Sequence, residues 1–217
     1  EESLSLREAL ARSKNMVTIR LVQEIGPQRA RAWAARFGLE EERQPLNLTL
    51  ALGTGAATPL QMARAYGAFA NGGRIAATRL IERIEDAQGI TIWKADAPPE
   101  PKEAVSERNA FMTAQLLSGV MRDGTGARAS QMLGRWDLYG KTGTTNDAID
   151  AWFVGFQRSR VGAVWIGYPT PKSLGERETG GGLALPVWVA TMREALKGIP
   201  TDPLAPPAAG LTQVGED

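Results

Sequence analysis

Two short stretches of the sequence combine residue types that could do chemistry. Residues 141–145 read Lys-Thr-Gly-Thr-Thr, an ammonium beside three hydroxyls, and residues 13–15 read Ser-Lys-Asn. The chain has no histidine and no cysteine, which excludes a Ser-His-Asp triad, a cysteine nucleophile and nearly every zinc site. A catalyst made of these residues would therefore use a lysine, a carboxylate, a tyrosine or a hydroxyl as its base.

The pattern around residues 13–15 predicts a corner between two helices. Ser5 and Glu8 form a capping box before a helix over residues 6–12. Asn15 is a candidate N-cap for a second helix that ends at Gly26. Further helices are expected over residues 28–37, 59–70, 107–121 and 187–196.

The hydrophobic period changes to two after Leu138, which predicts strands. Residues 151–156 and 161–167 are expected to form an antiparallel hairpin beside the strand that carries residues 141–145. A second hairpin is expected within residues 80–93, and loops over 122–130 and 179–186. Four prolines among the last 20 residues predict a flexible tail over 198–217, after a domain over 1–197.

The overall charge gives no sign of a charged macromolecular partner. Lysine and arginine number 25 against 24 acidic residues, so a net charge of +1 offers no electrostatic case for nucleic acid or an anionic membrane. No apolar run approaches the roughly 18 to 20 residues of a membrane span. The absence of cysteine fits an oxidising compartment.

Residues 13–15 and 141–145 together resemble the second and third motifs of the penicillin-recognising serine enzymes, Ser-x-Asn and Lys-Thr-Gly. The stretches TPLQMARAYGAFANGG, YGKTGTTNDAIDAWFVGF and TGGGLALPVW resemble the transpeptidase domain of class A penicillin-binding proteins. The resemblance covers about Ser5 to Leu196. The pentapeptide carries most of it, because a chosen pentapeptide arises by chance in about one in 10⁴ chains of this length.

The resemblance implies an α+β fold, with a helical region and an antiparallel sheet, and catalytic roles for Ser13, Asn15 and Lys141. Ser13 would carry a proton to the leaving amine of the substrate, and the charged Lys141 would favour this transfer. A lysine in a dry pocket has a lowered pKa and can work near neutral pH. We expect the Ser13 hydroxyl and the Lys141 ammonium to lie about 3 to 5 Å apart, and Lys14 to point to solvent.

The same resemblance implies that Thr142, Gly143, Thr144 and Thr145 bind substrate. The hydroxyls of Thr142 and Thr144 would donate to the C-terminal carboxylate of a peptide, and the bare backbone of Gly143 would let the peptide lie along the strand. In the family, the N–H at the Thr144 position completes an oxyanion hole. The implied partners are D-Ala-D-Ala stem peptides and β-lactams, at the periplasmic face of the inner membrane, with no cofactor and no metal.

The family's first motif, Ser-x-x-Lys, is missing from this chain. Only Thr91 to Lys94 has a similar spacing, and it lies in the hairpin predicted within residues 80–93. We therefore expect the C-terminal part of a transpeptidase domain, incomplete at its N-terminal side and inactive alone, with an apolar surface covered by the missing part, a partner chain or a symmetry mate. Two alternatives remain: a non-catalytic module that binds stem peptides, and a carboxypeptidase or β-lactamase on the same fold.

Overall fold

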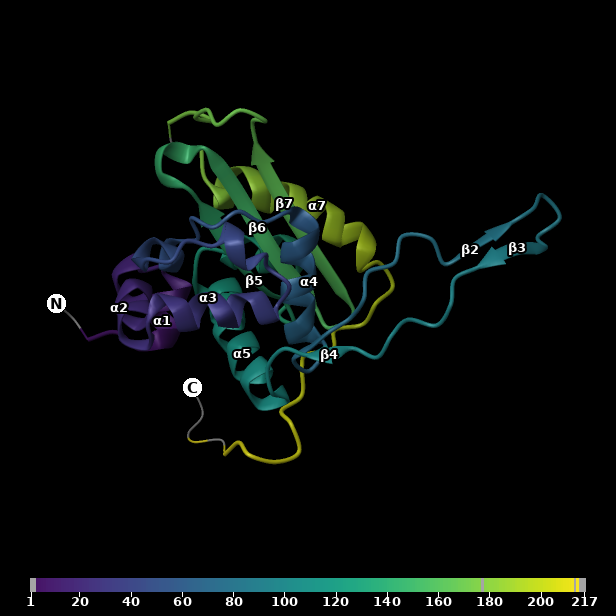
Figure 1. The fold of residues 1–217 in the computed structure, drawn as a ribbon, viewed down its shortest axis with the longest axis horizontal. Helices are drawn as coiled ribbons and strands as arrows, with labels where there is room; N and C mark the ends of the chain where they lie inside the picture. Colours follow the sequence, from purple (N-terminus) through teal and green to yellow (C-terminus); the bar gives the residue numbers. More distant parts are fainter. Residues whose placement is uncertain (1–2, 177, 213, 215–217) are drawn as a thin grey trace.

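A computed structural model describes residues 3–176, 178–212 and 214, and its architecture is α+β. The centre is an antiparallel sheet of three strands in the order β5-β6-β7 (Figure 1). Its strands are β5 (Tyr139–Thr144), β6 (Asp150–Gln157) and β7 (Arg160–Gly167). Only residues 158 and 159 separate β6 from β7, so the predicted hairpin and its neighbouring strand are confirmed.

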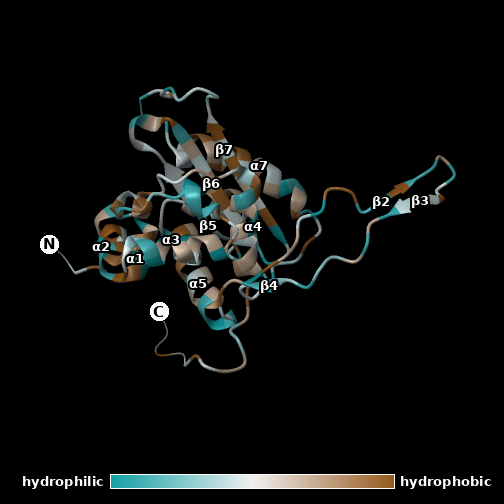
Figure 2. Cartoon of the chain, viewed as in Figure 1, coloured by the Kyte–Doolittle hydropathy of each residue, from teal (hydrophilic) through white to brown (hydrophobic). Residues whose placement is uncertain are grey.

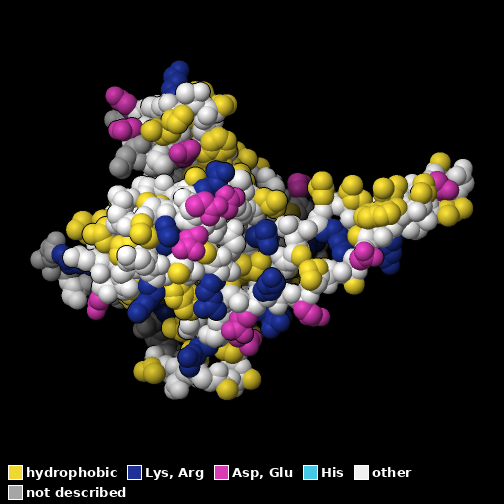
Figure 3. All heavy atoms as spheres, viewed as in Figure 1, with side chains coloured by type: hydrophobic (Ala, Val, Ile, Leu, Met, Phe, Trp, Pro, Cys, Tyr) yellow, Lys and Arg dark blue, Asp and Glu magenta, His cyan; other side chains and the backbone are white. Residues whose placement is uncertain are grey.

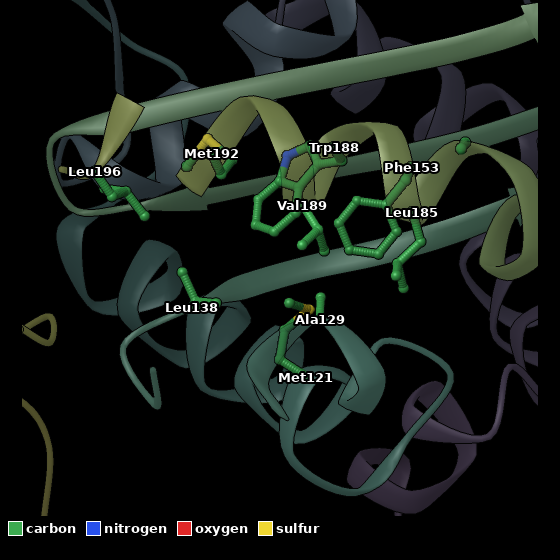
Figure 4. Packing of buried hydrophobic residues seen from close by; sticks show 10 residues of the cluster. Met121, Ala129, Leu138, Phe153, Leu185, Trp188, Val189, Met192 and Leu196 are labelled. Carbon is green, nitrogen blue, oxygen red and sulfur yellow. The ribbon is translucent and has the colours of Figure 1, made fainter. Parts of the chain in front are cut away.

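Helices cover both faces of this sheet because apolar side chains of β6 point to both sides. On one face Phe153 packs against Trp188 of α7 (Leu185–Ala195), with ring centroids 4.9 Å apart. On the other face Phe156 stacks on Tyr139, and α4 (Pro59–Ala70) packs there. Figure 4 shows the cluster on the α7 side, which also contains Met121, Ala129, Leu138, Leu185, Val189, Met192 and Leu196.

Three helices precede the sheet in the chain: α1 (Leu6–Ala11), α2 (Asn15–Ile25) and α3 (Pro27–Arg36). The predicted capping box of α1 is present. Helix α1 packs against α5 (Glu107–Asp123), which in turn packs against β5, so the end of α1 is held near that strand. The predicted cap of the second helix is wrong: α2 begins at Asn15 itself, and its N-cap is Lys14, which makes no side-chain cap bond.

A long arm leaves the body between α4 and α5. At its tip β2 (Arg83–Glu85) and β3 (Thr91–Lys94) pair antiparallel, as the sequence predicts (Figure 1). The ribbon of the arm is coloured hydrophobic in several segments of Figure 2, and Figure 3 shows hydrophobic side chains on its surface. Six of the large apolar residues of the arm are exposed. The remaining short elements are η1 (Glu41–Arg43), η2 (Leu48–Leu52), β1 (Arg74–Ile75), β4 (Lys102–Glu103) and η3 (Asn146–Ala148).

Two of the predicted loops contain helical turns. Helix α6 (Ala127–Leu133) begins inside the predicted loop over 122–130, because alanine, glutamine, methionine and leucine favour a helix. The predicted loop over 179–186 contains a π-helical turn, η4 (Gly180–Ala184). The Thr179 hydroxyl caps this turn by accepting from the Gly182 N–H at 3.0 Å. This cap and the packing of the turn against the rest of the fold offset the poor helix propensity of glycine.

The segment over 198–217 has no helix or strand in its described part, but its first residues are tied to the body. Arg135 donates to the carbonyls of Ile199 and Pro200, and the Leu204 N–H donates to the Tyr139 hydroxyl at 2.9 Å. Residues 213 and 215–217 of the predicted flexible tail lie outside the described residues. The boundary at residue 198 stays a prediction. Among the helices that the structure describes, none is long and apolar enough to cross a membrane.

Candidate active site

The corner after α1 presents Ser13 in a left-handed backbone conformation, with φ of 52°. The Ser13 N–H donates to the Leu10 carbonyl at 3.0 Å, and the Lys14 N–H donates to the Ala9 carbonyl at 2.8 Å. These bonds satisfy carbonyls at the end of α1, as in helix ends that usually place glycine at this position. The turn leaves Ser13 exposed.

Strand β5 carries the second part of the site along one edge of the sheet. Lys141 lies opposite Val154 and Thr142 lies opposite Phe153 in the register with β6. Within the described part of the chain β5 pairs with β6 alone, so its other edge is open. An open edge offers backbone N–H and C=O groups to an added strand.

The structure brings the two parts together. Lys141 Nζ donates to Ser13 Oγ at 2.8 Å and to the Thr142 carbonyl at 3.1 Å. The predicted proximity of Ser13 and Lys141 is confirmed, although 128 positions separate them in the sequence. Burial lowers the pKa of Lys141 to about 8, because desolvation disfavours its charged form. Lys141 is thus mainly protonated at pH 7 and titrates closer to neutral pH than an ordinary lysine.

The other two residues of the first stretch lie at the same corner without joining this contact. Lys14 and Asn15 are exposed. Among the hydrogen bonds of the described residues, none links Asn15 to Lys141. The catalytic roles of Ser13, Asn15 and Lys141 stay predictions.

The threonine hydroxyls of the site already have partners within the protein. Thr142 Oγ1 lies 2.7 Å from Thr125 Oγ1. Thr144 Oγ1 accepts from the Gly180 N–H at 3.0 Å. Thr145 Oγ1 accepts from the Asp150 N–H at 2.8 Å, just beyond the end of β5. Thr144 and Thr145 use an oxygen lone pair in these bonds, so each keeps its hydroxyl hydrogen for a ligand.

Sequence reasoning missed two residues that touch the site, Thr125 and Gly180. A Cβ at Gly180 would overlap the Gly143 and Trp152 carbonyl oxygens, so a side chain there would displace β5. The sequence signal for Thr125 was a threonine between two glycines, and the signal for Gly180 was a run of three glycines. Both stretches are predicted as loops, and although the second also contributes to the family resemblance, neither residue is predicted to touch the site, because a sequence does not show which backbone a glycine approaches.

Helix α2, which begins directly after Lys14, has exposed apolar side chains, and the apolar surface expected beside the site stays a prediction. Helix α2 buries none of its residues, and Met16, Leu21 and Ile25 are 60%, 40% and 46% exposed. What covers this surface stays a prediction. Within the residues that the structure describes, no three histidine, cysteine, aspartate or glutamate side chains could together hold a metal ion.

Comparisons with known proteins agree with this geometry. The "Penicillin binding protein transpeptidase domain" family matches residues 1–192. Penicillin-binding protein 1A of Neisseria lactamica is 44% identical over 216 residues, covering 98% of this chain and 27% of that protein. The chain thus spans about a quarter of that relative's length. The crystal structure of penicillin-binding protein 1A from Haemophilus influenzae matches with a TM-score of 0.87 and 30% identity, over 94% of this chain and 36% of that one.

A structure of PonA1 from Mycobacterium tuberculosis in complex with penicillin V also matches. Its TM-score is 0.75 at 26% identity, over 95% of this chain and 60% of that chain. The predicted fold is confirmed by these likenesses. Because the family match covers most of the chain and the two motif stretches meet in one site, this chain belongs to the penicillin-binding protein transpeptidase family.

Proposed function

We propose that this chain is the C-terminal part of the catalytic domain of a peptidoglycan D,D-transpeptidase. The whole transpeptidase is called the intact protein below. Such an enzyme transfers the acyl group of a D-Ala-D-Ala stem peptide, through a serine acyl-enzyme, to the amine of a neighbouring stem. The observation that carries the proposal is the bond from Lys141 Nζ to Ser13 Oγ beside the open edge of β5. The penicillin V complex of the similar PonA1 supports β-lactams as ligands.

Ser13 is suited to pass a proton. Its oxygen accepts from the Lys141 ammonium, so its own hydrogen remains free to donate. In acyl transfer the nucleophile's oxygen bonds to the carbonyl carbon, and the bond to the terminal D-Ala nitrogen breaks. The proton that the nucleophile loses reaches this nitrogen through the Ser13 hydroxyl. The Lys141 charge holds the Ser13 oxygen in place and favours the transfer electrostatically.

Strand β5 is suited to hold the substrate. A peptide that pairs with its open edge would run past Gly143, which adds no side chain to the surface. The hydroxyls of Thr142 and Thr144 lie on one face of the strand, since they are two residues apart. They would donate to the terminal carboxylate, with the Lys141 ammonium as the nearby charge.

The nucleophile would come from outside this chain, because none of its serines has a lysine three residues later. The helix that bears the nucleophile would also cover the apolar side chains of α2. We place the intact protein at the periplasmic face of the inner membrane, where stem peptides are cross-linked.

Acylation of the intact protein by a fluorescent penicillin tests this proposal. Ser13→Ala and Lys141→Ala should each slow acylation by about 10² to 10⁴-fold, since a proton relay or a charged donor is lost. The matched control is Lys14→Ala, which removes a neighbouring exposed ammonium and should change the rate little. An equal loss in the Lys14 variant would contradict the assignment of roles.

The missing Ser-x-x-Lys motif also supports a second candidate, a non-catalytic module that binds stem peptides. The two candidates differ in covalent chemistry. An intact protein that binds a D-Ala-D-Ala peptide but forms no adduct with penicillin would be such a module. A protein that hydrolyses the peptide, and transfers nothing to an added amine, would be a carboxypeptidase, and one that hydrolyses penicillin with turnover would be a β-lactamase on the same fold.

A further inference from the structure

The loop between α5 and α6 touches both parts of the candidate site through one residue. The Thr125 N–H donates to the Ala11 carbonyl at 3.1 Å, at the end of the helix that leads to Ser13. The Thr125 hydroxyl oxygen lies 2.7 Å from the Thr142 hydroxyl oxygen, next to Lys141 in β5. Thr125 therefore links the helix corner to the strand.

The glycines on either side of Thr125 make this close approach possible. A Cβ on Gly124 would overlap the Ala11 carbonyl, and a Cβ on Gly126 would lie 2.7 Å from Met121 Sδ. At Gly124 the nearest atoms are backbone, so a side chain there would displace the loop from Ala11, whereas at Gly126 the Met121 side chain would have to move. Its backbone is also fixed by N–H bonds from Gly124 and Gly126 to the Val120 carbonyl.

The two hydroxyls can be arranged in two ways. Each has one hydrogen to donate and two lone pairs to accept, and at 2.7 Å one of them must donate to the other. If Thr142 donated to Thr125, it would have no hydrogen left for a ligand. If Thr125 donates, the Thr142 hydrogen is free to point toward the open edge of β5.

We propose that Thr125 is a positioning residue that donates to Thr142 and so turns the Thr142 hydroxyl toward the carboxylate of the substrate. This rests on the proposed function, in which Thr142 binds that carboxylate. A carboxylate only accepts hydrogen bonds, so Thr142 must donate to it, and Thr125 donates to Thr142. In such a chain each hydrogen bond strengthens the next. The Thr125 N–H bond to Ala11 holds this chain in register with the Ser13 corner.

The test compares a ligand with a carboxylate and one without, in the intact protein. The rate constant of acylation by benzylpenicillin and by its methyl ester is measured for wild type, Thr125→Val and Thr125→Ser. Valine keeps the shape of threonine without its hydroxyl, whereas serine keeps the hydroxyl. We expect Thr125→Val to slow the reaction with benzylpenicillin about 5- to 30-fold, the effect of one such bond, and to leave the reaction with the ester within about 2-fold. Thr125→Ser should restore the rate.

An equal loss with both ligands would overturn the proposal, because it would show that Thr125 only supports the fold. No loss with either ligand would overturn it as well. If the ester reacts too slowly to measure, the Thr125→Val/Thr142→Val double variant is compared with Thr142→Val in the reaction with benzylpenicillin. The two acylation rates should be almost equal. A further loss of rate equal to that of Thr125→Val alone would refute action through Thr142. Failure of the proposed function is distinguishable, because then wild type itself would not be acylated by benzylpenicillin.

Discussion

Replacing Asp137 by asparagine should strongly destabilise the protein. Asp137 is fully buried just before β5, and accepts bonds from Arg135 Nε at 2.9 Å and Nη2 at 2.7 Å. It also accepts from Gln157 Nε2 at 3.0 Å and from the Asp202 N–H at 2.9 Å. The asparagine amide has the same shape, but it lacks the negative charge and turns an N–H₂ group toward one of these donors.

The magnitude follows from the burial of this pair. The Arg135 side chain is only 12% exposed, and removing one partner of a buried ion pair costs about 3 to 5 kcal/mol. For a chain of this length each kcal/mol lowers Tm by about 2 to 4 °C, so Tm should fall by about 6 to 20 °C.

The pH dependence has a definite sign. Burial alone would raise the pKa of Asp137, but the bonds from Arg135, Asp202 and Gln157 and the Arg135 charge hold it below its usual value. A lowered folded-state pKa stabilises the fold above the unfolded value of about 3.9, and this stabilisation is lost as the pH falls through the folded-state pKa. Wild type and variant should therefore converge in strongly acidic solution.

The assay is urea and thermal unfolding of the chain, followed by circular dichroism, at neutral and acidic pH. The matched control is Asp123→Asn, at an ion pair whose side chains are 58% and 70% exposed and whose loss should cost under about 1 kcal/mol. Protease digestion should also release the segment after residue 198 more readily in the Asp137 variant, because the Asp202 N–H loses its acceptor. A loss below about 1 kcal/mol for Asp137→Asn would refute the reasoning.

Three further outcomes are expected. Mass spectrometry of this chain alone should show no covalent adduct after incubation with benzylpenicillin, and a stable adduct on any serine would contradict the missing nucleophile. In the intact protein, the rate of acylation should fall as the pH rises through about 8, because the Lys141 ammonium loses its proton there. The Lys141→Arg variant keeps its charge, so its rate should not fall in this pH range. A wild-type rate that increases there would mean that neutral Lys141 is the active form. Gly180→Ala should slow acylation by about 10²-fold, because the added methyl would displace Gly143. The control Gly182→Ala should have little effect, since its added methyl meets only the Thr179 hydroxyl at 3.4 Å. Equal rates in the two variants would contradict a role for the close approach of Gly180 to Gly143.

The regular parts of the fold could be predicted from local chemistry. The capping box at Ser5 and the period-two pattern after Leu138 are determined by neighbouring residues, and the structure confirms them. Short elements were less predictable, because tertiary contacts decide them. Helix α6 has seven residues beginning directly after Gly126, and the three glycines of η4 form a turn only against β5.

Some residues of the candidate site could likewise be predicted from the sequence, and others could not. Lys141 and Ser13 were identified from their motifs, and their meeting followed from the resemblance rather than from any local rule. Thr125 could not be identified, because its importance comes from two contacts with residues far away in sequence. The chemistry of a single residue is visible in a sequence, but a hydrogen bond from a loop to a distant helix or strand is not.

The left-handed backbone of Ser13 limits which residues can occupy this corner. A β-branched side chain is strongly disfavoured at a φ of 52°, whereas serine tolerates it at a modest cost. Threonine would supply the same hydroxyl, but it would strain the turn that ends α1. Glycine or asparagine would suit the backbone, but neither has a hydroxyl. Serine is therefore selected by the conformation of the chain as much as by its reactivity, and an exchange between the two hydroxyl amino acids that is harmless on a protein surface would not be harmless here.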